Sequence, residues 1–326
     1  MSKAEINGEI INKPKTGKRR LRKVVKWIVI SIFLLIFFSL AAMPPLMMKD
    51  MVDRRVDFKK VFTAEEFGLS SNKLSLQTSD GLNIVAYEVY APNPKAVVIF
   101  LSGIHNPSVT AFYGHSKLLL EKGYASILVE MRAHGESEGD VICVGFKEYL
   151  DTEAAVEYIK NDTRYKDVPI VVFGLSMGGA TAINSIGEIP EIDGLISLSA
   201  YSSWEDAFHD NMLLMDSPKF LAAIQKPFVK LYTTFKYGFE SFNISPKKEI
   251  KKLGNRPALL MHSKDDSQVP FASFERIMAN APKHVETWVR EGDLHLILKD
   301  ASFLEPEKDK EYTETILSFL DKHFGQ

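Results

Sequence analysis

The stretch Val168-Pro-Ile-Val-Val-Phe-Gly-Leu-Ser-Met-Gly-Gly-Ala180 decides the fold of this chain. Its apolar, β-branched run from Ile170 to Phe173 predicts a strand that is buried on both faces. The next five residues, Gly174 to Gly178, fit the pattern G-x-S-x-G, and the small-residue segment Gly179 to Glu188 predicts a helix. A strand, a sharp turn and a helix in this order predict a strained backbone at Ser176 that presents its hydroxyl group.

Glycines explain why such a turn can form. The strained backbone of Ser176 tolerates only small neighbours, which Gly174 and Gly178 supply, and Gly179 lets the following helix pack closely. The same helix directs its positive end toward the Ser176 hydroxyl. The alternative is a chance match in a glycine-rich turn, and the flanking strand and helix argue against it.

The charge of the 326-residue chain is unevenly distributed. Residues 1–49 hold ten Lys or Arg against two Asp or Glu, whereas the whole chain has a formal net charge of −2, so the body is acidic. An acidic body argues against nucleic acid as a partner. The single cysteine, Cys143, excludes an internal disulfide framework.

A membrane anchor is predicted near the N-terminus. A basic tail over residues 1–26 precedes an uncharged apolar run over residues 27–48, which is long enough to cross a bilayer as a helix. The excess of Lys and Arg in the tail predicts a single-pass protein of the cell membrane, with a cytoplasmic N-terminus and an extracytoplasmic catalytic domain. One alternative is a cleaved signal peptide, because Ser39-Leu-Ala41 resembles a cleavage site. The other is a buried core helix, which the absence of a polar face disfavours.

The rest of the chain alternates strands and helices after a connector predicted over residues 49–71. Strands are predicted over residues 74–77, 82–90, 96–101, 125–130, 170–173, 194–198, 258–262 and 286–289, and helices over 114–122, 149–161, 179–188, 271–279 and 310–324. This alternation predicts an α/β fold, with a mostly parallel central sheet and helices on both faces. The turn signal Asp80-Gly81 makes the first two strands an antiparallel N-terminal edge. We therefore expect one domain over residues 72–326.

Residues 201–252 interrupt the alternation. This segment is helix-like and rich in aromatic residues, and a structureless loop of such length is uncommon in a compact domain. We predict a small helical cap over the carboxyl ends of the strands. The alternative is an ordinary helical insertion with a small core of its own.

Residues downstream of Ser176 supply the partners that a serine nucleophile needs. Serine requires a base to take its proton and a third group to hold that base. A predicted strand leads into Asp265-Asp266-Ser-Gln-Val-Pro270, and the last predicted strand leads into a loop that contains His295. The chain order Ser, Asp, His is that of a Ser-His-acid triad on a sheet of this kind.

Together, these motifs resemble those of the α/β-hydrolase superfamily, and in particular its bacterial esterase, lipase and serine aminopeptidase-like branch. The resemblance covers residues 72–324. Gly174 to Gly178 is similar to the family's nucleophile elbow, Arg132-Ala-His-Gly-Glu-Ser137 resembles its R-G-H-G-x-S loop, and Asp80-Gly81 resembles its first hairpin. In this order, the motifs specify the fold more closely than they specify a substrate.

The resemblance also implies a role for individual residues. It implies that Ser176 is the nucleophile and that His295 is the base. Because Asp266-Ser-Gln-Val-Pro270 resembles the family's D-x-x-V-P loop, it implies that Asp266 rather than Asp265 is the acid.

The resemblance further implies an oxyanion hole made of the backbone amides of Ile104 and Met177. The chain departs from the family here, because Ser102-Gly103 stands where the family often has His-Gly. Ser263 likewise replaces a frequent Gly in the acid loop.

These observations predict a membrane-anchored serine hydrolase that cleaves a carboxylic ester of a small-molecule acyl substrate. No cofactor or metal is expected, since the remaining histidines lack metal-ligand spacing, and the sequence leaves the question of protein partners open. The aromatic cap and the anchor favour an apolar acyl group, although a thioester or an amide would use the same machinery. Alternatives are an acyltransferase or a peptidase on the same triad, and a non-catalytic binding module on the same fold.

Overall fold

The computed structural model describes residues 16–325, so the first fifteen residues of the predicted basic tail lie outside the described residues. The chain divides into two compact units between Met43 and Pro44. The first unit is the N-terminal part of helix α1 (Thr16–Val52). The segment Arg19–Val52, with a mean hydropathy of 2.5, is long and apolar enough to cross a membrane, a test that a signal sequence also passes.

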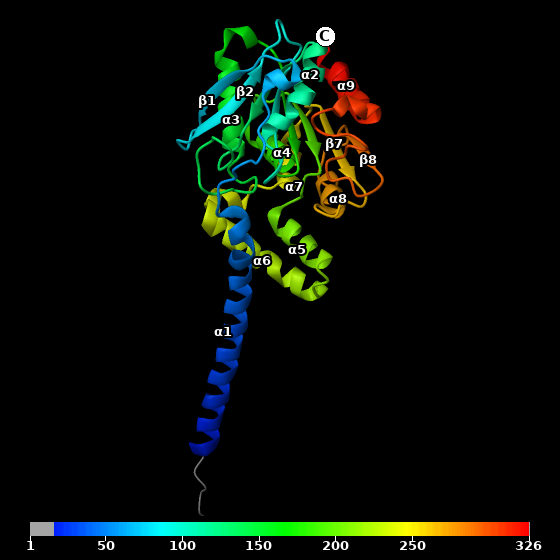
Figure 1. The fold of residues 1–326 in the computed structure, drawn as a ribbon. Coiled ribbons are helices and arrows are strands. Elements are labelled where there is room, and N and C mark those ends of the chain that lie inside the picture. Colours follow the sequence, from blue (N-terminus) through cyan, green and yellow to red (C-terminus); the bar gives the residue numbers. More distant parts are fainter. Residues whose placement is uncertain (1–15, 326) are drawn as a thin grey trace, which may run out of the picture. The chain divides into compact units, whose positions relative to one another are not determined.

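The second unit is built on a single eight-stranded sheet within the described residues (Figure 1), in the order β1-β2-β4-β3-β5-β6-β7-β8. The strands are β1 (Asn72–Gln77), β2 (Asn83–Val89), β3 (Val97–Leu101), β4 (Ala125–Val129), β5 (Ile170–Leu175), β6 (Gly194–Leu198), β7 (Ala258–Ser263) and β8 (Glu286–Arg290). β2 pairs antiparallel with both β1 and β4, and the remaining pairs are parallel. The predicted mostly parallel sheet with an antiparallel edge is confirmed.

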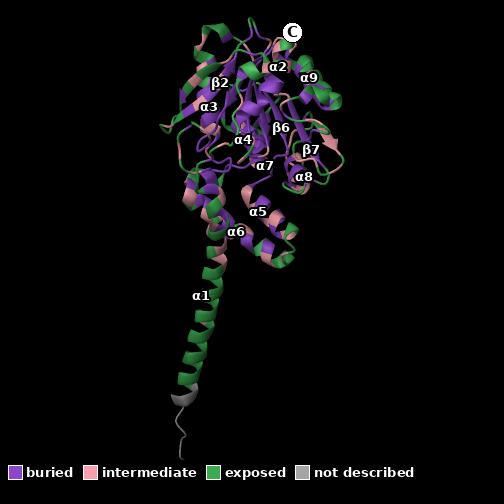
Figure 2. Cartoon of the chain, viewed as in Figure 1, coloured by how far each residue is buried: buried purple, intermediate pink, exposed green. Residues whose placement is uncertain are grey.

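Helices cover both faces of this sheet, as predicted. The body helices are α2 (Tyr113–Glu121), α3 (Tyr149–Asn161), α4 (Met177–Glu188), α8 (Ala272–Met278) and α9 (Lys310–Phe324). α2 and α9 share one core cluster with Phe100 of β3 and Phe173 of β5. The alternate residues Ile99 and Val172 are fully buried on the opposite face, where α4 contacts α3 and the central strands. Figure 2 shows β6 and β7 in the buried interior, which explains their mainly apolar sequences.

The segment predicted as a cap is helical. It contains α5 (Trp204–Leu214), α6 (Lys219–Tyr237) and α7 (Pro246–Glu249), and α5 packs against α6. Because α5 follows β6 directly, it begins at the carboxyl end of the sheet, where the residues after β5 and β7 also lie (Figure 1).

The structure corrects the predicted boundary between connector and body. Residues 49–71 were predicted as a connector and the domain was expected to begin at residue 72, but the compact unit begins at Pro44. Met48, Val52 and Val56 are buried; Met48 and Val52 lie one turn apart on α1, and Val56 follows the end of the helix. The Ile142 amide donates to the Val52 carbonyl, and Val56 forms a bridge with His134. Tertiary contacts therefore include this charged-looking segment in the body.

Candidate active site

Ser176 stands on the turn between β5 and α4. Its φ of 56° and ψ of −115° are strained for a residue that carries a Cβ atom. A Cβ atom on Gly174 would overlap the carbonyl group of Gly178, and one on Gly178 would overlap the carbonyl group of Leu101. The two glycines are therefore required by the backbone packing of the turn, as the motif predicts.

Asp266 and His295 meet at the carboxyl end of the sheet. Asp266 follows β7 and is only 3% exposed, and its Oδ2 lies 2.8 Å from His295 Nδ1. Its Oδ1 accepts hydrogen bonds from the amides of Gln268 and Val269, both at 2.9 Å. Asp265 is exposed. Of the two adjacent carboxylates, the structure thus brings Asp266 to the histidine.

The surroundings of Asp266 keep it ionised. Burial by itself raises the pKa of a carboxyl group, but the hydrogen bond with His295 and the Val269 amide outweigh burial and hold the pKa of Asp266 below its usual value. A carboxylate in this position accepts the Nδ1 proton of His295, which leaves Nε2 free to act as a base.

His262 stabilises the loop that carries Asp266, and the sequence did not indicate this role. It is buried on β7, donates from Nε2 to the Val269 carbonyl at 2.8 Å, and lies 3.6 Å from Asp266 Oδ2. Burial lowers the pKa of His262, and this favours the neutral ring beside the carboxylate. His262 therefore holds the acid loop by hydrogen bonding and by contact with Phe271 and Phe274.

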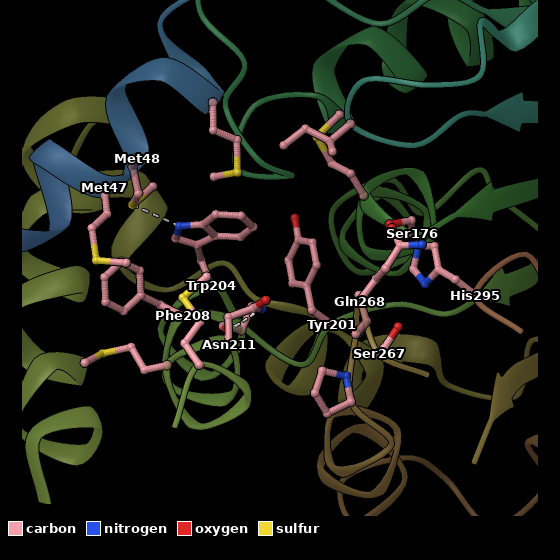
Figure 3. A pocket seen from close by; sticks show the side chains of 18 residues that line it. Met47, Met48, Ser176, Tyr201, Trp204, Phe208, Asn211, Ser267, Gln268 and His295 are labelled. Atoms are coloured by element: carbon pink, nitrogen blue, oxygen red, sulfur yellow. Dashed lines mark hydrogen bonds between the residues drawn. The ribbon is translucent and has the colours of Figure 1, made fainter. Parts of the chain in front are cut away.

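Ser176 and His295 stand where two cavities join. Both residues line each cavity, together with Ile104 and Gln268. Figure 3 shows the imidazole ring of His295 beside Ser176. No hydrogen bond joins Ser176 Oγ to His295 within residues 16–325, and catalytic hydrogen bonds of this kind often form only in the substrate complex.

The two predicted oxyanion donors flank Ser176. Met177 is the first residue of α4, so its amide has no intrahelical acceptor. The loop after β3 passes close by, since a Cβ atom on Gly103 would lie 3.8 Å from the Ser176 Cβ. Ile104, the next residue, lines both cavities.

His134 holds the predicted oxyanion loop from outside. Its Nε2 lies 2.5 Å from the Ile104 carbonyl oxygen, and its Nδ1 lies 2.8 Å from the Arg132 carbonyl oxygen. The side chain thus fixes the peptide group that follows the Ile104 amide.

Two further contacts stabilise the loop. His105 donates from Nε2 to the Met51 carbonyl at 2.9 Å, which joins the loop to the last turn of α1. Ser108 Oγ donates to the buried Glu130 carboxylate at 2.9 Å. Burial raises the pKa of Glu130 to about 7, although the hydrogen bonds from Ser108 and Val109 oppose this rise.

The first cavity is apolar and has a volume of about 440 Å³. One wall belongs to the end of α1 and another to the cap, and Trp204 Nε1 donates to Met48 Sδ at 3.1 Å across them (Figure 3). Most of its lining is apolar, with many methionines and aromatic residues: Met47, Met48, Met51, Ile104, Met177, Tyr201, Trp204, Phe208, Met212 and Met215. Methionine is flexible and polarisable, so this lining can adapt to apolar groups of different shape.

The second cavity lies on the other side of Ser176. Its volume is about 620 Å³ and its lining is mixed, with Asn106, His105 and Ser302 among apolar residues such as Phe303. No Asp or Glu lines either cavity in the described part of the chain. No group of three metal-ligating side chains occurs there either.

Comparisons with known proteins agree with this fold. The family model of serine aminopeptidase, S33, matches residues 92–249. The chain is 24% identical to the uncharacterized protein YqkD of Bacillus subtilis, over 74% of this chain and 76% of that protein. An esterase from Pyrococcus furiosus has a similar structure, with a TM-score of 0.61 at 22% identity over 83% of this chain and 99% of the esterase. The chain is a member of the α/β-hydrolase superfamily.

One further relative of this α/β hydrolase bears on the N-terminal helix. An uncharacterized membrane protein of Saccharomyces cerevisiae is 25% identical over 44% of this chain and 50% of its own length. The structural likeness establishes the α/β-hydrolase fold, so the activity has to be argued from the site itself.

Sequence reasoning missed the residues that position the site of this α/β hydrolase. His134 stands inside the R-x-H-G motif, and that motif was the available signal for its role. The contact between His105 and the Met51 carbonyl has no such signal, because any residue provides a carbonyl group.

Proposed function

We propose that this protein is a serine hydrolase that cleaves carboxylic esters of apolar acyl groups. The observation that supports this most strongly is the strained Ser176 turn beside the Asp266–His295 pair, at the junction of two cavities. A nucleophile, a base and a group that orients the base are the parts that acyl transfer requires.

The chemistry follows from these positions. His295 Nε2 takes the proton of Ser176 Oγ as that oxygen attacks the ester carbonyl carbon, and the negative charge develops on the carbonyl oxygen. The amides of Ile104 and Met177 stabilise this charge, and loss of one such donor costs about 3 kcal/mol of barrier. His295 then protonates the departing alcohol and afterwards activates the water molecule that hydrolyses the acyl-enzyme.

The two cavities suit the two halves of an ester. The acyl group would occupy the methionine-rich cavity and the alcohol the mixed cavity. Each methylene group buried there contributes about 0.8 kcal/mol, so the rate constant kcat/KM should rise with acyl chain length until the cavity is filled.

The family model's description favours a peptidase as a second candidate. An aminopeptidase must pair the substrate's ammonium group with an acidic or other polar partner, since an unpaired buried charge is costly. The acidic residues that would do so are missing from both cavity linings in the described chain. The absence of acidic residues from the described cavity linings favours an ester over a peptide as the substrate.

The apolar run of α1 would anchor the enzyme in the cell membrane. Residues 27–48 carry no charged side chain, whereas Arg19, Arg20, Arg22, Lys23 and Lys26 precede them. This asymmetry supports a cytoplasmic N-terminus and an extracytoplasmic body. Protease added to intact protoplasts should then degrade the body and spare an N-terminal tag, whereas a resistant body would place the active site in the cytoplasm.

Replacement of the nucleophile tests the activity. Ser176→Ala should lower ester turnover about a millionfold, because no other group can form the acyl-enzyme, and should leave the melting temperature close to that of the wild type. Hydrolysis of p-nitrophenyl esters and labelling by a fluorophosphonate probe would measure this. Undiminished labelling of the alanine variant would overturn the assignment.

A further inference from the structure

Helix α6 turns an apolar face outward. After Lys219, every exposed residue of α6 is apolar, namely Phe220, Ala223, Ile224, Pro227, Leu231 and Phe235. Phe220 and Phe235 are 68% and 69% exposed. The spacing of three, four and seven residues places them on one side of the helix. A surface helix of a water-exposed body has the opposite arrangement.

The polar residues of α6 fix this orientation. Lys226 forms an ion pair with the buried Asp206 at 2.7 Å, and Lys236 pairs with Asp53. These cations are directed toward α5 and the segment after α1, so they hold the polar side of α6 against the body. The apolar side is left outside as a consequence.

The apolar surface continues beyond α6 in both directions. Phe239 is 75% exposed and contacts the Phe235 ring at 5.9 Å. At the other end, Met215 after α5 is 67% exposed and also lines the apolar cavity beside Ser176. Met215 therefore connects the outer surface of the cap with the proposed acyl site, and the exposed Asp216 and Lys219 lie between it and Phe220 in the sequence.

We propose that this α6 face, defined by Phe220, Ile224, Leu231, Phe235 and Phe239, inserts into the interface of a lipid bilayer. Phenylalanine and leucine on one helix side are typical of helices that lie in the interface plane. The chain itself would bring the body to a bilayer, because the body begins at Pro44, within the segment Arg19–Val52 that is long and apolar enough to cross a membrane.

The proposal names a substrate class and rests on the proposed function. An ester whose acyl chain lies in the bilayer would reach Ser176 along Met215 and the methionine-rich cavity, without its acyl chain crossing water. The substrate class implied by the α6 face is therefore membrane lipids that contain an acyl ester bond. Esters dissolved in water would be hydrolysed without help from this face.

A fluorescence experiment tests the insertion without reference to activity. Cys143 is the single cysteine of the chain, so Cys143→Ser combined with Phe235→Cys gives one labelling site for the fluorophore NBD. The full chain is reconstituted into nanodiscs of phosphatidylcholine and phosphatidylglycerol. Glu314→Cys, at an exposed position on α9, is the matched control. We expect blue-shifted emission and quenching by doxyl-labelled lipid at position 235 only.

The possible results separate the occupants of this face. If NBD at position 235 emits at the same wavelength as NBD at position 314, the proposal is overturned. A blue shift without quenching by doxyl lipid would also overturn it, because the face would then be covered by protein, such as a second copy of the chain.

Kinetics test the consequence for the substrate. Phe220→Ser with Phe235→Ser should lower hydrolysis of a diacylglycerol embedded in vesicles about tenfold, and should leave hydrolysis of a water-soluble acetyl ester unchanged. Glu314→Ser is the control that should change neither rate. An equal loss on both substrates would contradict the proposal. If the wild type hydrolyses neither substrate, the proposed function fails, whereas the fluorescence result still decides whether α6 inserts.

Discussion

The turn that carries Ser176, the proposed nucleophile, and the loop after β3, the proposed oxyanion loop, flank the same serine, but different contacts stabilise them. Neighbours in the sequence fix the turn, because Gly174 and Gly178 leave space that a Cβ atom would fill. The oxyanion loop depends on remote groups, namely the Met51 carbonyl, the Glu130 carboxylate and the His134 ring. A steric requirement fails completely when it is violated, whereas a set of separate hydrogen bonds weakens step by step.

The largest effect should come from breaking the steric requirement. Gly178→Ala places a Cβ atom into the carbonyl groups of Leu101 and Ser102, so β3 and the turn must move apart. We expect no measurable ester hydrolysis or fluorophosphonate labelling, and a loss of about 3 kcal/mol in the free energy of unfolding. Gly81→Ala is the contrasting control: its φ of +91° strains the variant's backbone, but its Cβ atom would meet nothing within 4 Å, so it adds no steric overlap. A Gly178→Ala enzyme with wild-type labelling would show that the turn tolerates bulk.

The acid loop should show the next largest effect. Asp266→Asn should lower turnover about 10⁴-fold, because the amide no longer holds the correct tautomer of His295. Asp265 is next to Asp266 but exposed. Asp265→Asn should therefore change turnover less than about threefold, as is usual for a surface substitution. Steady-state kinetics of both variants on one ester would measure the difference. Equal losses would mean that the contact between Asp266 and His295 does not carry catalysis.

Loss of one remote contact should weaken the oxyanion loop without destroying it. His134→Gln removes the hydrogen bond to the Ile104 carbonyl, so the Ile104 amide is less well aimed. We expect kcat to fall about 10- to 100-fold, less than for loss of a donor itself, with KM nearly unchanged. His209→Gln, in the cap and outside both cavity linings, serves as the control. A change in KM alone would assign His134 to substrate binding instead.

The smallest effect concerns stability and depends on pH. The folded-state pKa of Glu130 is raised to about 7 from an ordinary value of 4.5. The folded state therefore binds the proton more tightly than the unfolded state, and stability falls as the pH rises from about 4.5 to about 7. Glu130→Gln should remove this fall, which amounts to at most about 3 kcal/mol in the free energy of unfolding. The variant should therefore have a higher melting temperature than the wild type at pH 8. Thermal unfolding in detergent at pH 5 and pH 8 would detect it, and parallel pH profiles of the two proteins would contradict it.

The contrast between local and remote contacts also explains which features the sequence could predict. The turn at Ser176 and the helices α3 and α9 depend on local residue patterns, and the sequence predicted both helices with the observed bounds. The strands β3 to β7 were recognisable because burial on both faces demands continuous apolar runs. The acid loop was identified through its resemblance to a family motif.

Contacts between remote segments left little trace in the sequence. The segment after Met48 looked like a solvated connector because it contains Lys49, Asp50 and Asp53. Its apolar residues at positions 48, 52 and 56 were the signal of packing, but three residues do not distinguish a buried helix end from chance. Backbone acceptors such as the Ile104 carbonyl have no side-chain identity at all, so their partners appear only in the fold.

The last turns of α1 determine whether a body that is cut from the N-terminal helix would keep its proposed hydrolase activity. Met47, Met48 and Met51 form one wall of the apolar cavity, and Val52 is bonded to the body through Ile142. A peptidase cut after Ala41 would release the body from its anchor with the methionine-rich cavity complete. A cut after Val52 would instead shed a body that has lost this wall and the Met51 support of the oxyanion loop. If the body faces outward, as we propose, a cut at the first position would free an active hydrolase from its anchor, whereas a cut at the second would inactivate it.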